Sequence, residues 1–316
     1  MKGTLPYAYF RGNVVPAEQA QISIASHSLQ YGMTCFGGIR GFFRDNVTRV
    51  FRLEDHWERL MNASRILGME YYLSYEQFKD IIGKLIAANN FQGDVYFRPF
   101  IYSSTERLAP RIPGLTFDIA IYMVELGQYF DPNKGLRLCI SSWQKFSDNC
   151  LPTKAKAGGC YVNSSLATTE AIRAGYDDAL VIDQDGYVVE GSVSNLIMIY
   201  RDQAFIPPLG EALLEGVTLR TMIEFLKEAG IEIVRESIDR SMVYCAQELI
   251  MVGTAVQVAW VASVDGRPLG KIEDVISKKE AGPGPVCRLL REKFAQTIAG
   301  THPRANEWST DFSFKG

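Results

Sequence analysis

The stretch DALVIDQDGYVVEGSVSNLIMIY, residues 178–200, has apolar runs separated by the short polar turns DQDG and GSVS. Apolar runs of this length between Gly, Asp and Ser clusters are typical of β-strands joined by tight turns, so the pattern predicts an antiparallel meander. Glu190 lies at a strand end, where a charge is unusual unless a partner such as an aromatic nitrogen cation pairs with it. A strand-end glutamate that reaches water would leave the same pattern. Asn195 opens the next strand, where its amide can hydrogen-bond the turn.

Helical patterns flank this meander on both sides. One helix is expected from about Cys160 to Ala174 and ends at Gly175. Another is expected in VTLRTMIEFLKEAG, residues 217–230, and ends at Gly230. The second helix begins at Gly216, Val217 and Thr218, where free N–H groups and the helix dipole attract an anion such as phosphate. An ordinary threonine N-cap is the alternative.

A long apolar run, ELIMVGTAVQVAWV at residues 248–261, is interrupted by Gly253, Thr254 and Ala255. The N–H groups and the hydroxyl exposed at such a break could hold a phosphate or a carboxylate. A β-bulge would leave the same trace in the sequence.

The N-terminal part mixes strands and helices. The patterns predict a hairpin that turns at Gly12-Asn13, a capping box of Ser74 with Gln77, and strands at 94–102 and 117–126. They also predict a helix within residues 52–69, because apolar residues recur there at three- and four-residue steps, namely Leu53, Trp57, Leu60, Ala63 and Leu67. The turn-forming segment that starts GQYFDPNKG at residue 127 predicts a domain boundary. We therefore expect a small α/β domain at 1–126, an interdomain loop at 127–137 and a larger α/β domain at 138–316.

Two lysines stand close together in PTKAKAGGCY, residues 152–161. Lys156 has alanine and glycine neighbours that leave room for a planar ligand against the backbone, whereas Lys154 follows a Pro-Thr pair. If the stretch is extended, both side chains point to one side, because a strand repeats every two residues. Either lysine could also be a solvated charge, so the pattern leaves open which of them, if either, is reactive.

The composition excludes several classes of function. A formal charge of −3 without a basic stripe argues against a nucleic-acid partner, and no apolar run reaches the roughly 18 residues that a membrane span needs. The N-terminus lacks the apolar core of a signal peptide, so we expect a cytoplasmic protein. The 3 histidines are far apart and the cysteines have no CxxC spacing, so no metal site is expected.

Taken together, these pieces resemble the fold-type IV pyridoxal-phosphate enzymes, and most closely the branched-chain amino-acid aminotransferases. The resemblance covers residues 7 to 300 and is carried by seven stretches in the order of the family: SHSLQYGMTCFGGIRGF, HWERLMNASRILG, VYFRPFIY, PTKAKAGGCYVNSSLA, GYDDALVIDQDGYVVEGSVSNL, LLEGVTLR and MVGTA. It implies the two-domain α/β (α+β) fold of the D-amino-acid aminotransferase type.

The resemblance also implies roles for individual residues. Lys156 matches the Schiff-base lysine that moves the proton during transamination, and Glu190 matches the carboxylate that pairs with the pyridinium nitrogen. The other residues that match cofactor positions are Arg59, Tyr161, Asn195, Leu214, Val217, Thr218 and Thr254. Those that match the substrate pocket are Tyr31, Phe36, Gly38, Tyr96, Arg98, Tyr129, Thr254 and Ala255.

The implied reaction exchanges amino groups between L-branched-chain amino acids and 2-oxoglutarate, with Arg98 taking the distal carboxylate. A loop of a partner subunit closes the site in this family, which makes TERLAPR at residues 105–111 a candidate and implies a homodimer or larger homo-oligomer. Two alternatives share the cofactor set: a D-amino-acid or (R)-amine transaminase, and an aminodeoxychorismate-lyase-type enzyme. A binding scaffold without cofactor is the non-enzyme alternative.

Departures from the usual family pattern concern the pocket and its surroundings. Gly37 replaces a usual glutamate, Leu126 a tryptophan, Leu219 an arginine and Ile197 an aromatic residue. Because the residues that match cofactor positions are all present, the resemblance defines the type of reaction more closely than the range of amino donors and acceptors.

Overall fold

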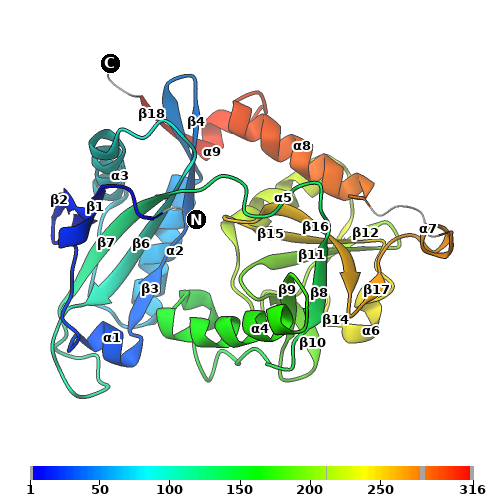
Figure 1. Cartoon of the computed structure of the whole chain (residues 1–316), viewed down its shortest axis with the longest axis horizontal. Coiled ribbons are helices and arrows are strands. Elements are labelled where there is room, and N and C mark those ends of the chain that lie inside the picture. The colour runs from blue at the N-terminus through cyan, green and yellow to red at the C-terminus, as the bar shows by residue number, and fades with distance from the viewer. Residues whose placement is uncertain (1–2, 211, 278–281, 314–316) are drawn as a thin grey trace. The chain divides into compact units, whose positions relative to one another are not determined.

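The computed structural model describes residues 3–210, 212–277 and 282–313. The chain divides into two compact units (Figure 1). The first contains residues 1–127, 154–160 and 296–316, and the second contains residues 128–153 and 161–295. Residues 154–160 thus belong to the first unit although the chain on both sides of them belongs to the second.

An antiparallel sheet of 8 strands organises the first unit, in the order β18-β5-β4-β6-β7-β1-β2, with β3 paired to β6. The strands are β1 (Tyr7–Phe10), β2 (Asn13–Pro16), β3 (Thr34–Phe36), β4 (Ile39–Arg44), β5 (Val47–Phe51), β6 (Val95–Ser103), β7 (Phe117–Glu125) and β18 (Ser309–Ser313). The helices are α1 (His27–Tyr31), α2 (Leu53–Ile66), α3 (Tyr75–Asn89) and α9 (Ala305–Trp308), and short 3₁₀ turns lie at Ala17–Gln19, Thr153–Ala155 and Gly158–Cys160.

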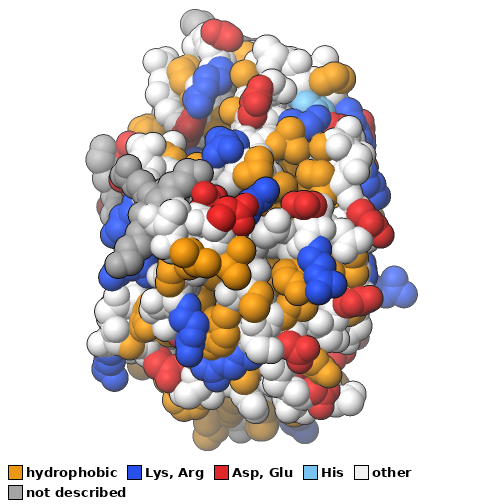
Figure 2. All heavy atoms as spheres, turned by 90° about the vertical axis from the view of Figure 1, so that its right-hand side faces the viewer, with side chains coloured by type: hydrophobic (Ala, Val, Ile, Leu, Met, Phe, Trp, Pro, Cys, Tyr) orange, Lys and Arg blue, Asp and Glu red, His pale blue; other side chains and the backbone are white. Residues whose placement is uncertain are grey.

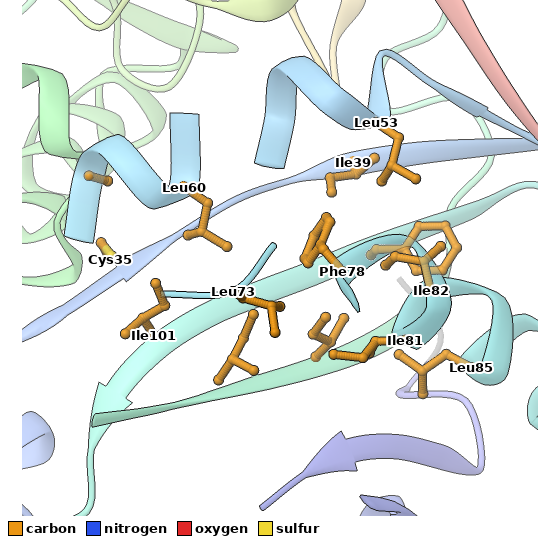
Figure 3. Close-up of a cluster of buried hydrophobic side chains, with 14 of the residues drawn as sticks. Cys35, Ile39, Leu53, Leu60, Leu73, Phe78, Ile81, Ile82, Leu85 and Ile101 are labelled. Atoms are coloured by element: carbon orange, nitrogen blue, oxygen red, sulfur yellow. The ribbon is translucent and has the colours of Figure 1, made fainter. Parts of the chain in front are cut away.

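The core of the first unit lies between α2, α3 and one face of this sheet (Figure 3). Leu53 and Leu60 of α2, Phe78 of α3, and Ile39 and Ile101 of the strands are buried together. The apolar spacing predicted this face of α2, and the capping box of Ser74 with Gln77 is confirmed at the start of α3. The hairpin predicted at Gly12-Asn13 is also confirmed, because β1 pairs with β2 antiparallel.

A mixed sheet of 10 strands organises the second unit, in the order β13-β12-β11-β15-β16-β8-β9-β10-β14, with β17 paired to β16. The pairs β12–β13, β8–β16 and β8–β9 are parallel. The strands are β8 (Leu136–Ile140), β9 (Asp178–Ile182), β10 (Tyr187–Gly191), β11 (Asn195–Tyr200), β12 (Gln203–Phe205), β13 (Ile233–Val234), β14 (Ile238–Asp239), β15 (Glu248–Gly253), β16 (Gln257–Val264) and β17 (Arg267–Pro268). The helices are α4 (Tyr161–Arg173), α5 (Val217–Glu228), α6 (Arg240–Val243), α7 (Ile272–Ile276) and α8 (Pro285–Ala299).

The predicted meander is only half right. β9 and β10 form the expected hairpin, but β11 pairs with β12 and β15 instead of β10. The reason lies in the turn after Glu190, where the Gly191 N–H donates to the Ser194 carbonyl and the Ser192 N–H donates to the Ala179 carbonyl. These two bonds close a tight turn, after which the chain enters the sheet beside β15 and not beside β10.

The surface of the second unit mixes side chains of both charges. On the face in Figure 2, acidic, basic and hydrophobic side chains alternate, and neither charge dominates. Among the residues that the structure describes, no helix combines the length and the apolar character that crossing a bilayer requires.

Candidate active site

Strand β6 carries Tyr96 and Arg98 on the face of its sheet that is opposite to the core. The residues that alternate with them, Val95 and Phe97, are buried against α2 and α3. Arg98 Nη2 donates a hydrogen bond to the Tyr96 hydroxyl at 3.3 Å. The Arg98 Cζ lies 4.6 Å from the centre of the Phe36 ring. The guanidinium is therefore held by a phenol and an aromatic face, which leaves its charge available to an anion.

Arg98 has no carboxylate within ion-pair distance among the described residues, and its buried Nε has no hydrogen-bond partner there. Arg98 is half-buried, and taking a cation out of water without a counter-charge is costly unless a ligand supplies the charge. The structure thus gives Arg98 the surroundings of a residue that binds an acidic group.

The bend between β3 and β4 lies next to Tyr96 and Arg98. The Gly37 N–H donates to the Pro99 carbonyl at 2.8 Å, and Pro99, which has no N–H of its own, leaves no donor unpaired at this bend. A Cβ on Gly38 would lie 1.8 Å from the Tyr96 hydroxyl oxygen, so the tyrosine covers a backbone position that only glycine can provide. Because Gly38 has no side chain, the Tyr96 hydroxyl can lie directly against its backbone.

Lys156 contacts the same aromatic ring as Arg98. Its Nζ lies 5.2 Å from the centre of the Phe36 ring, and its carbonyl accepts a hydrogen bond from the Phe36 N–H at 3.2 Å. An amine and a guanidinium thus share one aromatic side chain, although they are far apart in the sequence.

The backbone also distinguishes Lys156 from Lys154. The stretch is not extended: Thr153–Ala155 forms a 3₁₀ turn that contains Lys154, and Lys156 follows it with a φ of 46°. This left-handed conformation is uncommon for a residue with a Cβ, and such conformations concentrate at functional sites. The backbone conformation therefore separates two lysines that the sequence pattern left equivalent.

The glycine pair that follows Lys156 fits the segment against β3. A Cβ on Gly158 would lie 2.1 Å from the Thr34 Oγ1, and a Cβ on Gly32 would lie 2.9 Å from the Gly159 Cα. The Gly159 N–H donates to the Gly32 carbonyl at 3.2 Å. The small residues thus serve close backbone packing within the first unit.

We expect Gly158→Ala to lower the free energy of unfolding by about 1–3 kcal/mol, the usual effect of inserting a methyl group into a filled space. The new methyl group would collide with the Thr34 hydroxyl. Urea denaturation measures the change. Gly127→Ala is the matched control, because a Cβ there has no neighbour within 4 Å. Equal denaturation midpoints for the two variants would contradict the packing argument.

Two further candidate residues of the first unit, Arg59 and Tyr31, contact other side chains than Phe36. Arg59 lies on α2, where its Nη2 is 3.4 Å from His56 Nδ1. Asp55, four residues before Arg59, accepts hydrogen bonds from both Nε and Nη2 of Arg52. Tyr31 ends α1, and its ring packs at 4.7 Å from that of His27. These contacts do not by themselves join either residue to the group around Phe36.

In the second unit, Glu190 is buried and paired. Its side chain is only 7% exposed, and Lys145 Nζ lies 2.7 Å from its Oε1. The Glu190 Oε2 accepts longer hydrogen bonds from the Leu214 N–H at 3.3 Å and from Asn195 Nδ2 at 3.4 Å. The interpretation of Glu190 as a strand-end residue in water is therefore wrong.

Asn195 fastens the loop before α5 to this carboxylate. Its Nδ2 donates to the Leu214 carbonyl at 2.8 Å, and a Cβ on Gly216 would lie 2.2 Å from its Oδ1. Helix α5 then begins at Val217 with Gly216 as N-cap and without a side-chain cap, and Thr218 is its buried second residue. The threonine N-cap interpretation is wrong, and N–H groups of the first turn are left for an anion.

The break at Gly253 is a hairpin turn, not a β-bulge. Gly253 pairs with Gln257 across β15 and β16, so Thr254 and Ala255 lie in the connecting loop. A Cβ on Gly253 would lie 3.6 Å from the Ser194 Cβ, which places this turn beside the one that follows Glu190. The buried Ser194 Oγ has no hydrogen-bond partner among the described residues.

Two tyrosine candidates also belong to the second unit. Tyr129 is 43% exposed, and its ring meets that of Phe130 edge to face at 4.8 Å. Tyr161 begins α4, where its carbonyl accepts a hydrogen bond from Ser165 Oγ at 2.9 Å. In the second unit, the structure thus groups Glu190, Asn195, Leu214 and the first turn of α5.

The four departures from the family pattern are all buried. Ile197 and Leu219 are 0% and 1% exposed in the second unit, and Leu126 is 7% exposed in the first. A Cβ on Gly37 would lie 3.0 Å from Pro99 Cγ, so a glutamate there would require this proline to shift.

The model of the protein family described as Amino-transferase class IV matches residues 39–264. The chain belongs to this family. A probable branched-chain-amino-acid aminotransferase of Aquifex aeolicus is 36% identical over 310 residues, which covers 97% of both chains. The resemblance that the sequence motifs predicted is therefore confirmed.

Solved structures of other class IV aminotransferases agree in fold. The branched-chain aminotransferase of Thermoproteus uzoniensis with norvaline superimposes with a TM-score of 0.91 at 32% identity, covering 98% of this chain and 99% of that one. The branched-chain amino acid aminotransferase of Thermobaculum terrenum in its PLP-bound holo form gives 0.90 at 27% identity, covering 98% and 99%. The predicted α/β fold class is confirmed.

Sequence reasoning missed three residues of this class IV aminotransferase that the geometry brings forward. Lys145 pairs with Glu190, the buried Ser194 hydroxyl has no hydrogen-bond partner among the described residues, and Arg40 is 2% exposed on β4 opposite Tyr96. Only the strand register could have indicated Arg40, since it requires knowing that β4 pairs with β6.

Within residues 3–210, 212–277 and 282–313, no three His, Cys, Asp or Glu side chains gather to hold a metal ion.

Proposed function

We propose that the chain is a pyridoxal-phosphate-dependent transaminase that exchanges amino groups between L-branched-chain amino acids and 2-oxoglutarate. The observation that carries this proposal is the group around Phe36, where Lys156 and Arg98 contact one ring. An amine that can take and give a proton and a guanidinium that can bind a second carboxylate are the two functions such an exchange requires.

The residues present fit the cofactor. Glu190 offers a buried carboxylate for a nitrogen cation, and the first turn of α5, which has no side-chain cap, offers N–H groups for a phosphate. Ser194 offers a buried hydroxyl that has no hydrogen-bond partner in the part of the chain that the structure describes. When bound, pyridoxal phosphate supplies an electron-accepting ring that stabilises the negative charge at the substrate Cα.

The roles proposed for the chain's own groups follow from their surroundings. Lys156 Nζ holds and moves the proton, Glu190 orients a protonated nitrogen, and Asn195 and Leu214 fix the loop that leads to the phosphate-binding turn. Val217, Thr218 and Arg59 are proposed as further phosphate contacts, and Tyr161 as a contact of the ring hydroxyl. Thr254 and Ala255 would bind the α-carboxylate through the N–H groups of their turn.

A second arginine supports the dicarboxylate acceptor. Arg40 lies opposite Tyr96 in the β4–β6 register, and burial lowers its pKa, while Asp94 and Tyr96 partly offset this effect. Its Nη1 donates only to the Gly127 carbonyl at 2.9 Å, and no carboxylate lies within ion-pair distance of it among the described residues. Two guanidinium groups on one sheet face favour a substrate with an acidic side chain, while Phe36 offers apolar surface to leucine or valine.

We also propose a homo-oligomer. Ile24, Leu29 and Leu108 are 86%, 61% and 87% exposed. The His27 N–H donates to the Thr105 carbonyl, and so ties the segment that carries Ile24 and Leu29 to the TERLAPR loop that carries Leu108. Exposed apolar side chains of this size in one region are typical of a protein interface.

A donor panel tests the proposed function. With 2-oxoglutarate as acceptor, L-leucine and L-valine should be converted at least about 100-fold more efficiently than D-alanine or (R)-phenylethylamine, which corresponds to about 2.7 kcal/mol of discrimination. Turnover of (R)-amines or D-alanine alone would instead support the alternative transaminase, and release of pyruvate from aminodeoxychorismate the lyase-type reaction. Protein that pyridoxal phosphate cannot colour would support the binding scaffold.

A further inference from the structure

Both side chains of the Lys145–Glu190 ion pair are largely buried. The two side chains are 12% and 7% exposed, and Lys145 Nζ lies 2.7 Å from Glu190 Oε1. By comparison, the Lys227–Glu224 pair of the same unit is 3.2 Å long with side chains 61% and 37% exposed. Burying two charges is expensive even when they pair, so stability alone gives no reason to keep this pair.

The two oxygens of Glu190 have unequal surroundings. Oε1 takes the short contact with Lys145, whereas the bonds to Oε2 from the described residues are the longer ones of Leu214 at 3.3 Å and Asn195 at 3.4 Å. Ordinary N–H···O bonds are about 2.9 Å long, so Oε2 is weakly bonded. It can still accept a strong hydrogen bond, and it faces the loop that the proposed function assigns to the cofactor.

Lys145 is itself held in place. Its N–H donates to the Ile182 carbonyl at 2.7 Å, at the end of β9, and β9 pairs with the strand that carries Glu190. Its ammonium group also lies 5.1 Å from the centre of the Phe146 ring. The backbone of one strand pair thus fixes both members of the ion pair.

From this geometry we propose that Lys145 is a positioning residue. It occupies Oε1, prevents the carboxylate from rotating, and presents Oε2 to the protonated ring nitrogen of a pyridine cofactor. This inference rests on the proposed function. Lys145 acts through Glu190 alone, so its removal should matter only when Glu190 is present.

The test is a double-mutant cycle of Lys145→Met and Glu190→Gln, read by the affinity of the apoprotein for pyridoxal phosphate in equilibrium dialysis. Lys145→Met should weaken binding by about 10–100-fold, the usual effect of losing a group that orients a ligand contact. In the Glu190→Gln background, the same change should alter binding less than about 3-fold. Lys145→Arg should restore most of the affinity, because it keeps the charge.

Thermal unfolding of the four unloaded proteins gives a second readout, with Lys227→Met as the matched control of an exposed pair. Lys145→Met alone should lower Tm, and adding Glu190→Gln should recover part of the loss, because no unpaired buried charge then remains. An equal loss of affinity in both Glu190 backgrounds, or none, would overturn the inference. Wild-type protein that takes up no pyridoxal phosphate would overturn the proposed function as well, whereas uptake that ignores Lys145 would overturn this inference alone.

Discussion

Lys156→Ala should reduce the leucine half-reaction by about 10⁴-fold or more, whereas Lys154→Ala should leave it within about 3-fold of wild type. The two residues are two positions apart, and the Nζ of Lys156 lies 5.2 Å from the centre of the Phe36 ring, which the guanidinium of Arg98 also contacts. Removing this amine removes the group that we propose bonds to the cofactor and moves the proton, and alanine cannot replace either role. Single-turnover absorbance changes with L-leucine measure the effect.

Borohydride reduction of the protein loaded with pyridoxal phosphate, followed by peptide mapping, provides the control. The label should appear on the peptide that contains Lys156 in wild type and in Lys154→Ala, and it should be lost in Lys156→Ala. Both variants should unfold within a few degrees of wild type, since neither lysine belongs to a hydrophobic core. A label on Lys154, or activity that survives without Lys156, would contradict the assignment.

Arg98→Met should lower kcat/KM for 2-oxoglutarate by about 10²–10³-fold, that is about 2.7–4 kcal/mol, because a partly buried carboxylate would lose its counter-charge. The Arg98 guanidinium is bonded to the Tyr96 hydroxyl and stacked on Phe36, with no carboxylate partner recorded within the described residues. Its charge is therefore available to the distal carboxylate of the acceptor. Steady-state kinetics with 2-oxoglutarate and with 4-methyl-2-oxopentanoate measure the two effects separately.

The apolar oxo acid is the internal control for this variant. Its kcat/KM should change by less than about 5-fold, because methionine keeps most of the volume and the apolar stem of arginine. Arg44→Met, which removes an exposed ion pair with Asp94 on the same sheet, should affect neither acceptor. Equal losses with both oxo acids would show that Arg98 supports the structure of the pocket and does not select the dicarboxylate.

Local patterns predicted much of the fold, because local interactions decide those elements. The spacing of Leu53 and Leu60 indicated the buried face of α2, and Ser74 with Gln77 indicated where α3 begins. The meander failed after Glu190 because two backbone hydrogen bonds in the turn, not side-chain pattern, direct β11 toward β15. Such bonds leave no trace in an apolar-polar pattern.

The sequence motifs named candidate residues for the site, but they did not predict the contacts of these residues. The motif order selected Lys156, yet its proximity to Phe36 depends on a left-handed backbone and on glycine packing that become visible only in three dimensions. Lys145 stayed unnoticed because its role depends on the partner that it meets, Glu190, which follows it by 45 residues in the chain. The residue assignments of the cofactor and substrate sites stay predictions that the variants above can test.

The return of residues 154–160 to the first unit constrains how related genes could be recombined. A chimera that takes residues 1–127 from one parent and everything after them from another would place a foreign lysine segment on the Gly32 and Thr34 surface of the first parent. That surface tolerates almost no added atom opposite Gly158. Functional hybrids should therefore be found where residues 154–160 are inherited together with β3, so that Lys156 comes from the same parent as a strand more than 100 positions upstream.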